Sequence, residues 1–212
     1  MTRLILVRHG QSEANQKRIF SGQRDYPLTE AGISQAELAA DYLEKNEKID
    51  LIYSSDLQRA YNTALATAKR FELDVSKDSS LREFDVGEWA GKSREQIAAE
   101  YPEVWNTEGS LRRYPGGEYT PDAFERSVNA IKKIAERHDG KCVMIAAHAG
   151  VIRSFAAFSN SISKYELSKM PDCHNASINV FEYHDGVSIP VRYDITEHLE
   201  SEITINSDKN II

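Results

Sequence analysis

Four residues in this chain have the types and the spacing to bind a small anion and react with it. They are Arg8, His9, Arg59 and His148, and each stands at or shortly after the end of a short apolar run. Cations that converge on one point repel one another unless an anion lies between them. Because the planar guanidinium group matches phosphate oxygens with paired hydrogen bonds, phosphate is the expected anion.

Phosphoryl transfer requires only a few further groups. It needs a nucleophile, positive charge around the phosphoryl oxygens and an acid that protonates the leaving oxygen. A neutral histidine can attack phosphorus to give a covalent phosphoenzyme, which water then hydrolyses. For the acid the sequence offers Glu83, Asp85 and Glu88, three carboxylates that stand among apolar residues in one short segment. The residue types alone leave the choice among these three open.

Hydrophobic patterns predict the elements that carry these residues. Apolar runs without alternation, typical of strands buried on both faces, occur at Leu4–Val7, Leu51–Tyr53 and Cys142–Ala147. Helical periods recur within residues 36–43, 57–68 and 124–135, with Thr29 as the expected cap of the first helix and Thr120 of the third. This alternation predicts an α/β fold, a three-layer sandwich whose mostly parallel central sheet is flanked by helices. Since ligands bind beyond the carboxyl ends of such strands, the reactive residues are expected to converge there.

The last quarter of the chain has a different pattern. Two apolar stretches, 177–183 and 187–193, flank Asp185-Gly186, which predicts a C-terminal β-hairpin at the edge of the sheet. Pro190 confines the second strand to an edge or a bulge, because proline has no N–H to donate.

The length of 212 residues predicts a single domain over residues 1–212. Residues from about 92 to 121 are expected to form an insertion over the active site. The polar, acidic tail from about 197 to 212 is expected to be partly disordered.

Charge and cysteine content narrow the class of protein. The net charge of −7 disfavours binding to nucleic acid or to an anionic membrane. Within residues 1–24, however, five basic residues stand against one acid, which fits a small anionic ligand. The chain has no apolar stretch of membrane-spanning length and no signal-peptide pattern, so a cytoplasmic protein is expected. Its two cysteines, Cys142 and Cys173, cannot form a disulfide framework, and Cys142 is expected to be reduced in a buried strand.

Together these residues resemble the histidine phosphatase superfamily, in its phosphoglycerate mutase-like branch. An RHG triplet alone would be weak support, but the matching segments follow one another over most of the chain. They are Arg8–Asn15, Phe20–Gly22, Leu28–Gly32, Ser54–Ala60, Leu81–Glu83, Gly87–Gly91, Pro115–Glu118 and Ala147–Arg153.

The resemblance implies a role for each candidate residue. His9 would be the phosphorylated nucleophile, and Glu83 the general acid and then the general base. The expected substrate-binding residues are Arg8, Asn15, Ser21, Gly22, Arg59 and His148. A bound phosphate dianion would favour the protonated form of His148. No metal and no cofactor are expected.

Three positions depart from common family patterns. Gln11 replaces a glutamate, Ala14 replaces the tryptophan usual in the mutases, and Ala149 replaces a glycine after the second histidine. None of these changes removes a catalytic group, so the chemistry is expected to be intact.

Alternatives remain for the fate of the phosphoenzyme. A mutase excludes water and returns the phosphoryl group to a second hydroxyl, whereas a phosphatase admits water. In the mutases the acid typically stands in a Glu-Arg-x-Tyr-Gly context, but here Glu83 precedes Phe-Asp-Val-Gly, as in the phosphatases. We therefore expect a phosphomonoesterase acting on small phosphorylated metabolites, with a cofactor-dependent phosphoglycerate mutase as the alternative. Arg112-Arg113 is either the arginine pair that mutases keep for a carboxylate or a solvated basic pair.

Two other classes are less favoured. A non-catalytic binder of phosphorylated ligands is disfavoured because all the catalytic groups are retained. A metal-dependent hydrolase is disfavoured because the sequence has no HExxH motif or paired-aspartate site, so turnover in excess EDTA is expected. The substrate and the oligomeric state stay open, and a homodimer is compatible with the sequence. Four aromatic residues either contact the leaving group or form a small satellite core, namely Tyr101, Trp105, Tyr114 and Tyr119.

Overall fold

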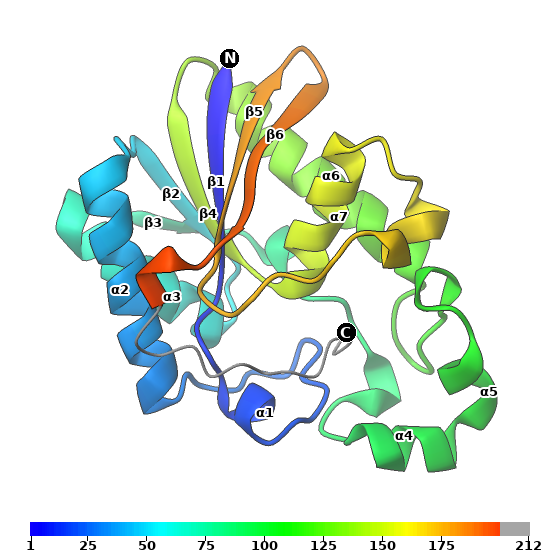
Figure 1. The fold of residues 1–212 in the computed structure, drawn as a ribbon. Coiled ribbons are helices and arrows are strands. Elements are labelled where there is room, and N and C mark those ends of the chain that lie inside the picture. Colours follow the sequence, from blue (N-terminus) through cyan, green and yellow to red (C-terminus); the bar gives the residue numbers. More distant parts are fainter. Residues whose placement is uncertain (200–212) are drawn as a thin grey trace.

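A six-stranded sheet lies at the centre of the computed structural model, which describes residues 1–199 (Figure 1). The strands are β1 (Thr2–Arg8), β2 (Leu51–Ser54), β3 (Val75–Lys77), β4 (Cys142–Ala147), β5 (Ile178–His184) and β6 (Val187–Ile195). Their order is β3-β2-β4-β1-β5-β6. Pairing is parallel from β3 through β1, β5 is antiparallel to β1, and β6 is antiparallel to β5. The predicted mostly parallel sheet with a C-terminal hairpin at its edge is confirmed.

Two pairs of helices cover the two faces of this sheet. The long helices are α2 (Glu30–Asn46), α3 (Gln58–Phe71), α6 (Thr120–Arg137) and α7 (Ala149–Ser159). Successive side chains of a strand point to opposite faces. In β1, Ile5 and Val7 therefore pack with α2 and α3, whereas Leu4 and Leu6 pack with α6 and α7. The three-layer sandwich follows from this alternation.

The helix N-termini match the sequence prediction in one case and not in the other. Thr29 caps α2, because its hydroxyl accepts a hydrogen bond from the Gly32 N–H at 3.0 Å. The expectation that Thr120 caps α6 is wrong. Tyr119 occupies the cap position without a side-chain bond, and the Thr120 hydroxyl instead donates to the Arg112 carbonyl at 3.1 Å. Because the Thr120 hydroxyl binds the Arg112 carbonyl, it does not cap the helix, and Thr120 is the first helical residue instead.

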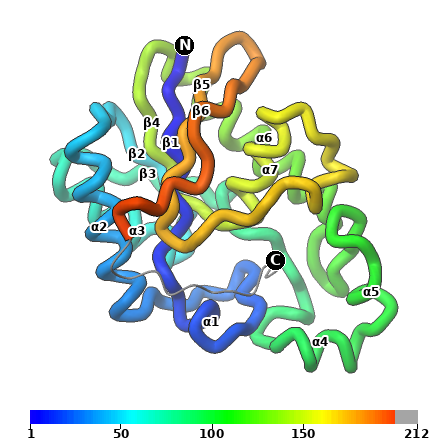
Figure 2. Tube along the Cα trace, in the orientation of Figure 1, coloured from blue at the N-terminus to red at the C-terminus, as the bar shows by residue number. Residues whose placement is uncertain are grey.

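Short elements complete the chain. They are α1 (Glu13–Gln16), α4 (Arg94–Glu100), α5 (Pro102–Asn106) and short 3-10 turns at Ser79–Leu81, Gly87–Trp89, Gly109–Leu111, Lys164–Lys169 and Glu197–Leu199. Figure 2 shows that the chain between α3 and α6 passes α1 before it reaches α4 and α5. Strand β3 was not predicted, because its sequence Val-Ser-Lys has a single apolar residue and its assignment rests on pairing with β2.

The β5–β6 hairpin turns as its sequence predicts. Asp185 and Gly186 have φ values of 48° and 83°, the positive values that a two-residue type I′ turn requires. Pro190 lies in the edge strand β6 opposite Phe181, next to register irregularities in β5. The expected tail beyond residue 199 lies outside the described residues.

Both cysteines are free. Cys173 is buried, but Cys142 is only half-buried, because it is the first residue of β4 rather than an interior one. Within residues 1–199, none of the helices is long and apolar enough to span a membrane.

A second, smaller core lies away from the sheet. It combines Phe20, Val86, Trp89, Ala90, Ile97 and Tyr114, with Tyr101, Val104 and Trp105 packed against it. For Tyr101, Trp105 and Tyr114, the satellite-core interpretation of the aromatic residues is therefore confirmed. Tyr119 lies apart from this core, beneath the guanidinium of Arg113.

Candidate active site

The carboxyl ends of three neighbouring strands bring the predicted residues together. Arg8 ends β1 opposite Ala147, the last residue of β4, so His9 and His148 leave the sheet side by side. Their ring centroids are 5.2 Å apart, at an angle of 61°. Ser55 leaves the adjacent β2 at the same edge, and its hydroxyl lies 2.9 Å from His148 Nε2.

His9 is held as a neutral ring with one nitrogen engaged. The side chain is buried, and its Nδ1 lies 2.7 Å from the Gly10 carbonyl oxygen, which can only accept. This bond places the proton on Nδ1 and leaves the lone pair on Nε2. Burial, and then the charges of Arg59 and Arg8, hold the pKa of His9 well below its usual range. The arrangement suits a nucleophilic Nε2.

The backbone around His9 is closely packed. The Gly10 N–H donates to the Thr63 hydroxyl at 3.1 Å, and a Cβ at Gly10 would lie 2.2 Å from the Gly32 carbonyl oxygen. The side-chain amide of Asn175 donates to the His9 carbonyl at 3.0 Å. Sequence reasoning missed Asn175, because a single asparagine before a strand carries no distinctive signal.

Arg59 is fully buried and fixes the neighbouring turn. Its guanidinium donates to the carbonyl oxygens of Gly22 at 2.8 Å and Arg24 at 2.9 Å. Burial lowers its pKa to about 10, so the group keeps its charge at neutral pH. Gly22 has a φ of 49°, and a Cβ there would lie 2.6 Å from Val86. The turn that contains Ser21 and Gly22 is therefore held against Arg59.

His148 is also buried and neutral. Burial is the main cause that holds its pKa well below the usual range, followed by the charge of Arg59. Its Nδ1 has no hydrogen-bond partner within residues 1–199, and the same is true of Nε in Arg8 and in Arg59.

Glu83 faces the first turn of α7, the helix that follows His148. Its Oε1 accepts from the Phe84 N–H at 2.9 Å, and its Oε2 accepts from the Gly150 N–H at 3.3 Å. The other two carboxylates are engaged elsewhere. Asp85 accepts from the Gly87 N–H within its own turn, and the exposed Glu88 accepts from the Tyr101 hydroxyl. Geometry therefore distinguishes Glu83 from both.

Asn15 is connected to the backbone of His9 through the side chain of Asn175. Its Oδ1 accepts from the Ser12 N–H at 3.0 Å and its own N–H donates to the Ser12 hydroxyl at 3.4 Å, and these two bonds form the capping box of α1. Asn15 Oδ1 also lies 3.4 Å from the amide nitrogen of Asn175, which also bonds the His9 carbonyl. The start of α1 is thereby tied to the backbone of the candidate nucleophile.

The two arginines of the Arg112-Arg113 pair have different surroundings. Arg112 donates to the carbonyl oxygens of Val104 at 3.3 Å and Trp105 at 3.1 Å, and its guanidinium lies over the Trp89 ring. It supports the small second core. Arg113 is exposed.

Within the part of the chain that the structure describes, no three residues among the histidines, cysteines and carboxylates gather as a metal site.

Comparison with known proteins gives consistent matches. The family model for the histidine phosphatase superfamily (branch 1) matches residues 4–196. Phosphoglycerate mutase-like protein 4 of Arabidopsis thaliana is 34% identical, over 93% of this chain and 86% of that protein. Phosphoserine phosphatase 1 of Hydrogenobacter thermophilus is 33% identical over the full length of both chains. The structure of a mycobacterial glucosyl-3-phosphoglycerate phosphatase, in complex with VO3, is 31% identical and aligns with a TM-score of 0.83, covering 91% of this chain and 98% of that one.

Proposed function

This chain belongs to branch 1 of the histidine phosphatase superfamily, and on that premise we propose that His9 and Glu83 carry out its reaction. The chain is a phosphoric monoester hydrolase that acts on small phosphorylated metabolites.

The observation that carries the proposal is a set of buried nitrogens with no partner. Arg8 Nε, Arg59 Nε and His148 Nδ1 are all buried beside the strand ends without an acceptor within residues 1–199. Native proteins leave few buried polar groups unpaired, and an unpaired one near a positive charge favours a bound anion. A phosphoryl group would give all three an acceptor, with Asn15 and the Ser21–Gly22 turn at its border.

The first chemical step transfers the phosphoryl group to the enzyme. His9 Nε2 attacks phosphorus, the bond from phosphorus to the leaving oxygen breaks, and the Glu83 carboxyl gives its proton to that oxygen. In the second step water attacks the phosphohistidine while the Glu83 carboxylate takes its proton. The P–N bond breaks, inorganic phosphate leaves, and both residues return to their starting states.

Hydrolysis is favoured over mutase activity by the surroundings of Arg112. Three of its five N–H groups, on Nε and Nη2, already donate to the carbonyl oxygens of Val104, Trp105 and Thr107, so Arg112 cannot present its whole guanidinium fork to the carboxylate of a sugar acid. Phosphoglycerate mutase remains the second candidate because one relative bears a mutase-like name.

The segment from about 92 to 121 is proposed to form one wall of the substrate site. Its residues Ile97 and Tyr114 pack in the same small core as Phe20 and Val86. Phe20 directly precedes the Ser21–Gly22 turn, and Val86 follows Glu83 by three residues. The segment is therefore joined to both chain segments that border the phosphoryl site.

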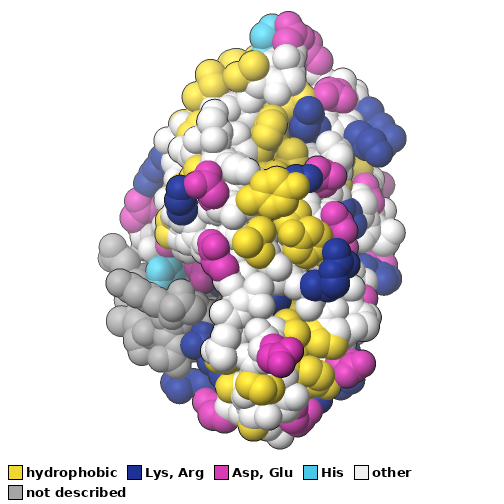
Figure 3. All heavy atoms as spheres, turned by 90° about the vertical axis from the view of Figure 1, so that its right-hand side faces the viewer, with side chains coloured by type: hydrophobic (Ala, Val, Ile, Leu, Met, Phe, Trp, Pro, Cys, Tyr) yellow, Lys and Arg dark blue, Asp and Glu magenta, His cyan; other side chains and the backbone are white. Residues whose placement is uncertain are grey.

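The cytoplasmic location and the homodimer are predictions that the structure does not test. Two free cysteines fit the reducing cytoplasm. Two surface features are compatible with a homodimer. Figure 3 shows hydrophobic side chains gathered among charged ones on one face of the molecule. Separately, the edge strand β6 exposes Val187, Ile189 and Val191. Sedimentation at several protein concentrations measures the assembly directly.

The experiment that tests the function is release of inorganic phosphate from a panel of phosphomonoesters in excess EDTA. The panel includes phosphoserine, sugar phosphates, nucleoside monophosphates and 3-phosphoglycerate, the last with and without 2,3-bisphosphoglycerate. Release that requires His9 supports the phosphatase, and the ranking of kcat/KM identifies the substrate class. Conversion to 2-phosphoglycerate with little release would show a mutase, and no reaction with any compound would favour a protein that binds phosphorylated ligands without turnover.

A further inference from the structure

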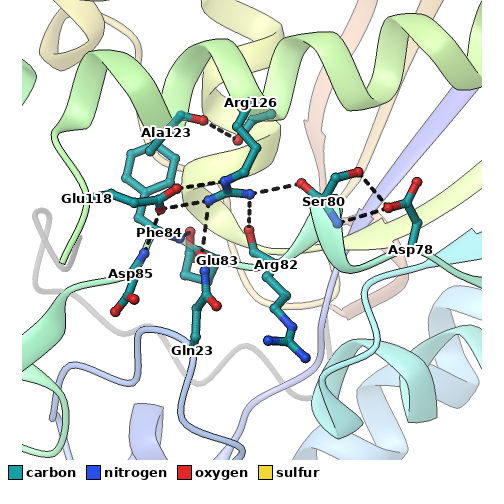
Figure 4. A network of polar contacts seen from close by, with 11 residues as sticks. Gln23, Asp78, Ser80, Arg82, Glu83, Phe84, Asp85, Glu118, Ala123 and Arg126 are labelled. Atoms are coloured by element: carbon teal, nitrogen blue, oxygen red, sulfur yellow. Dashed lines mark hydrogen bonds and ion pairs between the residues drawn. The ribbon is translucent and has the colours of Figure 1, made fainter.

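Arg126 has no part in the reaction as proposed, yet its guanidinium is turned toward the segment that carries Glu83 (Figure 4). It extends from α6, and its side chain is 23% exposed. Its Nη1 donates to the carbonyl oxygens of Ser80 at 2.9 Å and Arg82 at 2.8 Å, and its Nη2 donates to the Glu83 carbonyl at 3.3 Å. Beyond one 3-10 turn, this segment has no regular structure that would hold it.

Glu118 completes the contacts on the other side. Arg126 donates to its two carboxylate oxygens, both at 2.8 Å. The same carboxylate accepts from the Asp85 N–H at 2.8 Å, and the Glu118 N–H donates to the Asp85 carbonyl at 2.8 Å. All five N–H groups of the guanidinium are thus used, and the backbone is held on both sides of Glu83.

These bonds fix the backbone of the candidate acid itself. The two carbonyl groups that flank the Glu83 Cα, those of Arg82 and Glu83, both accept from Arg126. Fixing both peptide groups fixes the direction in which the Glu83 side chain leaves the backbone. The carboxyl then lies against the first turn of α7, where its Oε2 accepts from the Gly150 N–H.

We propose that Arg126, held by Glu118, is a positioning residue that aims the Glu83 carboxyl at the leaving oxygen of the substrate. This inference rests on the proposed role of Glu83. A shift of about 1 Å in a catalytic group can cost about 10²-fold in rate. Because Arg126 also donates to three backbone carbonyl groups, its removal is expected to cost some stability, so the inference is tested by the leaving-group dependence of the rate and not by stability.

The test compares Arg126→Met and Arg126→Lys with Arg70→Met. Arg70 is a matched control, because its side chain is 18% exposed and also pairs with carboxylates, those of Glu37 and Asp41, but on the opposite face of the sheet. The readouts are kcat and KM for an alkyl phosphate and for p-nitrophenyl phosphate, and the affinity for inorganic phosphate. An alkoxide needs a proton to leave, whereas p-nitrophenolate does not.

For Arg126→Met we expect kcat/KM on the alkyl phosphate, which reports the first chemical step, to fall by about 10- to 100-fold, within the range of a displaced general acid. The loss of kcat/KM on p-nitrophenyl phosphate and the change in phosphate affinity should both stay within about 3-fold, since the phosphate-binding groups are untouched. Arg126→Lys should recover part of the loss, and Arg70→Met should show none of it. Combined with Glu83→Gln, Arg126→Met should cost little more, because the group it positions is already lost.

Several outcomes overturn the inference. One is an equal loss of kcat/KM on both substrates, and another is a fall in phosphate affinity as large as the fall in kcat/KM on the alkyl phosphate. If Arg126→Met does not fold, Arg126→Lys is read by the same criteria. If Glu83→Gln shows the leaving-group difference and neither Arg126 variant does, only this inference fails. If Glu83→Gln itself shows no difference, the proposed acid is wrong, and the role of Arg126 falls with it.

Discussion

At the scale of single residues, the two buried histidines differ in what their free nitrogens can do. His9 has Nδ1 on the Gly10 carbonyl and Nε2 left for attack, whereas His148 has Nε2 on Ser55 and Nδ1 left over. Both rings are neutral without ligand, because burial and nearby arginines lower their pKa values. One site therefore offers a nucleophile and, beside it, a group that can take a proton when an anion binds.

His9→Ala should abolish turnover, because it removes the nitrogen that is proposed to form the phosphoenzyme. Glu83→Gln should slow turnover of an alkyl phosphate by about 10² to 10⁴, the usual range for a general acid. In kcat/KM, which reports the first chemical step, the Glu83→Gln loss should be smaller on p-nitrophenyl phosphate than on the alkyl phosphate. Steady-state rates and circular dichroism of both variants check these outcomes, and appreciable activity in folded His9→Ala would exclude the phosphohistidine mechanism.

The two neutral histidines also predict a pH dependence of stability. Below about pH 6.5, the ordinary histidine pKa, the unfolded chain binds a proton at each of these positions that the folded protein does not bind. The free energy of unfolding should therefore fall as pH falls from 6.5, by about 1.4 kcal/mol per pH unit for each histidine. This loss of stability extends from about pH 6.5 down to the lowered pKa values of the folded protein, because below those values the folded rings bind protons as well.

Urea unfolding between pH 7.5 and 5.5, in buffer without phosphate, measures this slope. His9→Asn should show a slope smaller by one proton. Half-buried His198, whose pKa is also lowered, contributes equally to both proteins and cancels in the comparison. Identical slopes would mean that His9 is protonated in the folded state.

At the scale of elements, the start of α7 connects His148 to Glu83. Gly150 is in the first turn of this helix, and a Cβ there would lie 2.4 Å from Glu83 Oε1 and 3.1 Å from the Phe84 ring. Close approach of the carboxylate to the helix backbone thus requires glycine at this position. The glycine serves the site, because alanine is intrinsically the better helix former.

Gly150→Ala should therefore separate activity from stability. The gain in helix propensity, up to about 1 kcal/mol, should offset the local crowding, so the thermal midpoint should change little. The kcat for an alkyl phosphate should fall by about 10-fold or more as the Glu83 carboxyl is displaced. In the Glu83→Gln background the same change should have little further effect. A loss of stability with unchanged kcat in Gly150→Ala would show that the carboxyl is not held at this helix.

The elements that sequence patterns predicted well are those in which burial determines the pattern. The runs that became β1, β2 and β4 are apolar throughout, and the Asp185-Gly186 turn needs two positive φ values. Strand β3 escaped prediction because a three-residue edge strand of mostly polar residues depends on its neighbour. Contacts distant in sequence, such as Asn175 with the His9 carbonyl and Ser55 with His148, also carried no local signal.

At the scale of the whole molecule, an anion at this site should stabilise the fold. Buried Arg59 and half-buried Arg8 repel each other across the site, and a bound phosphate dianion would reverse that repulsion. Because the site is assembled from the ends of three strands and the segments around Gly22 and Glu83, it exists only in the folded chain. Any ligand that binds only the folded state adds to its stability by mass action.

At 100 times its dissociation constant, phosphate or vanadate should add about 2.7 kcal/mol to the free energy of unfolding. For a chain of this size that corresponds to a rise of about 5 to 11 °C in the thermal midpoint. Chloride at matched ionic strength is the control for general salt effects, and His9→Ala should keep most of the rise, since the cations remain. Arg59→Met should lose most of it, with its own midpoint in chloride as the reference. The same rise for Arg59→Met and for the unaltered protein would place the anion elsewhere, and the strand-end site would then not be where phosphate binds.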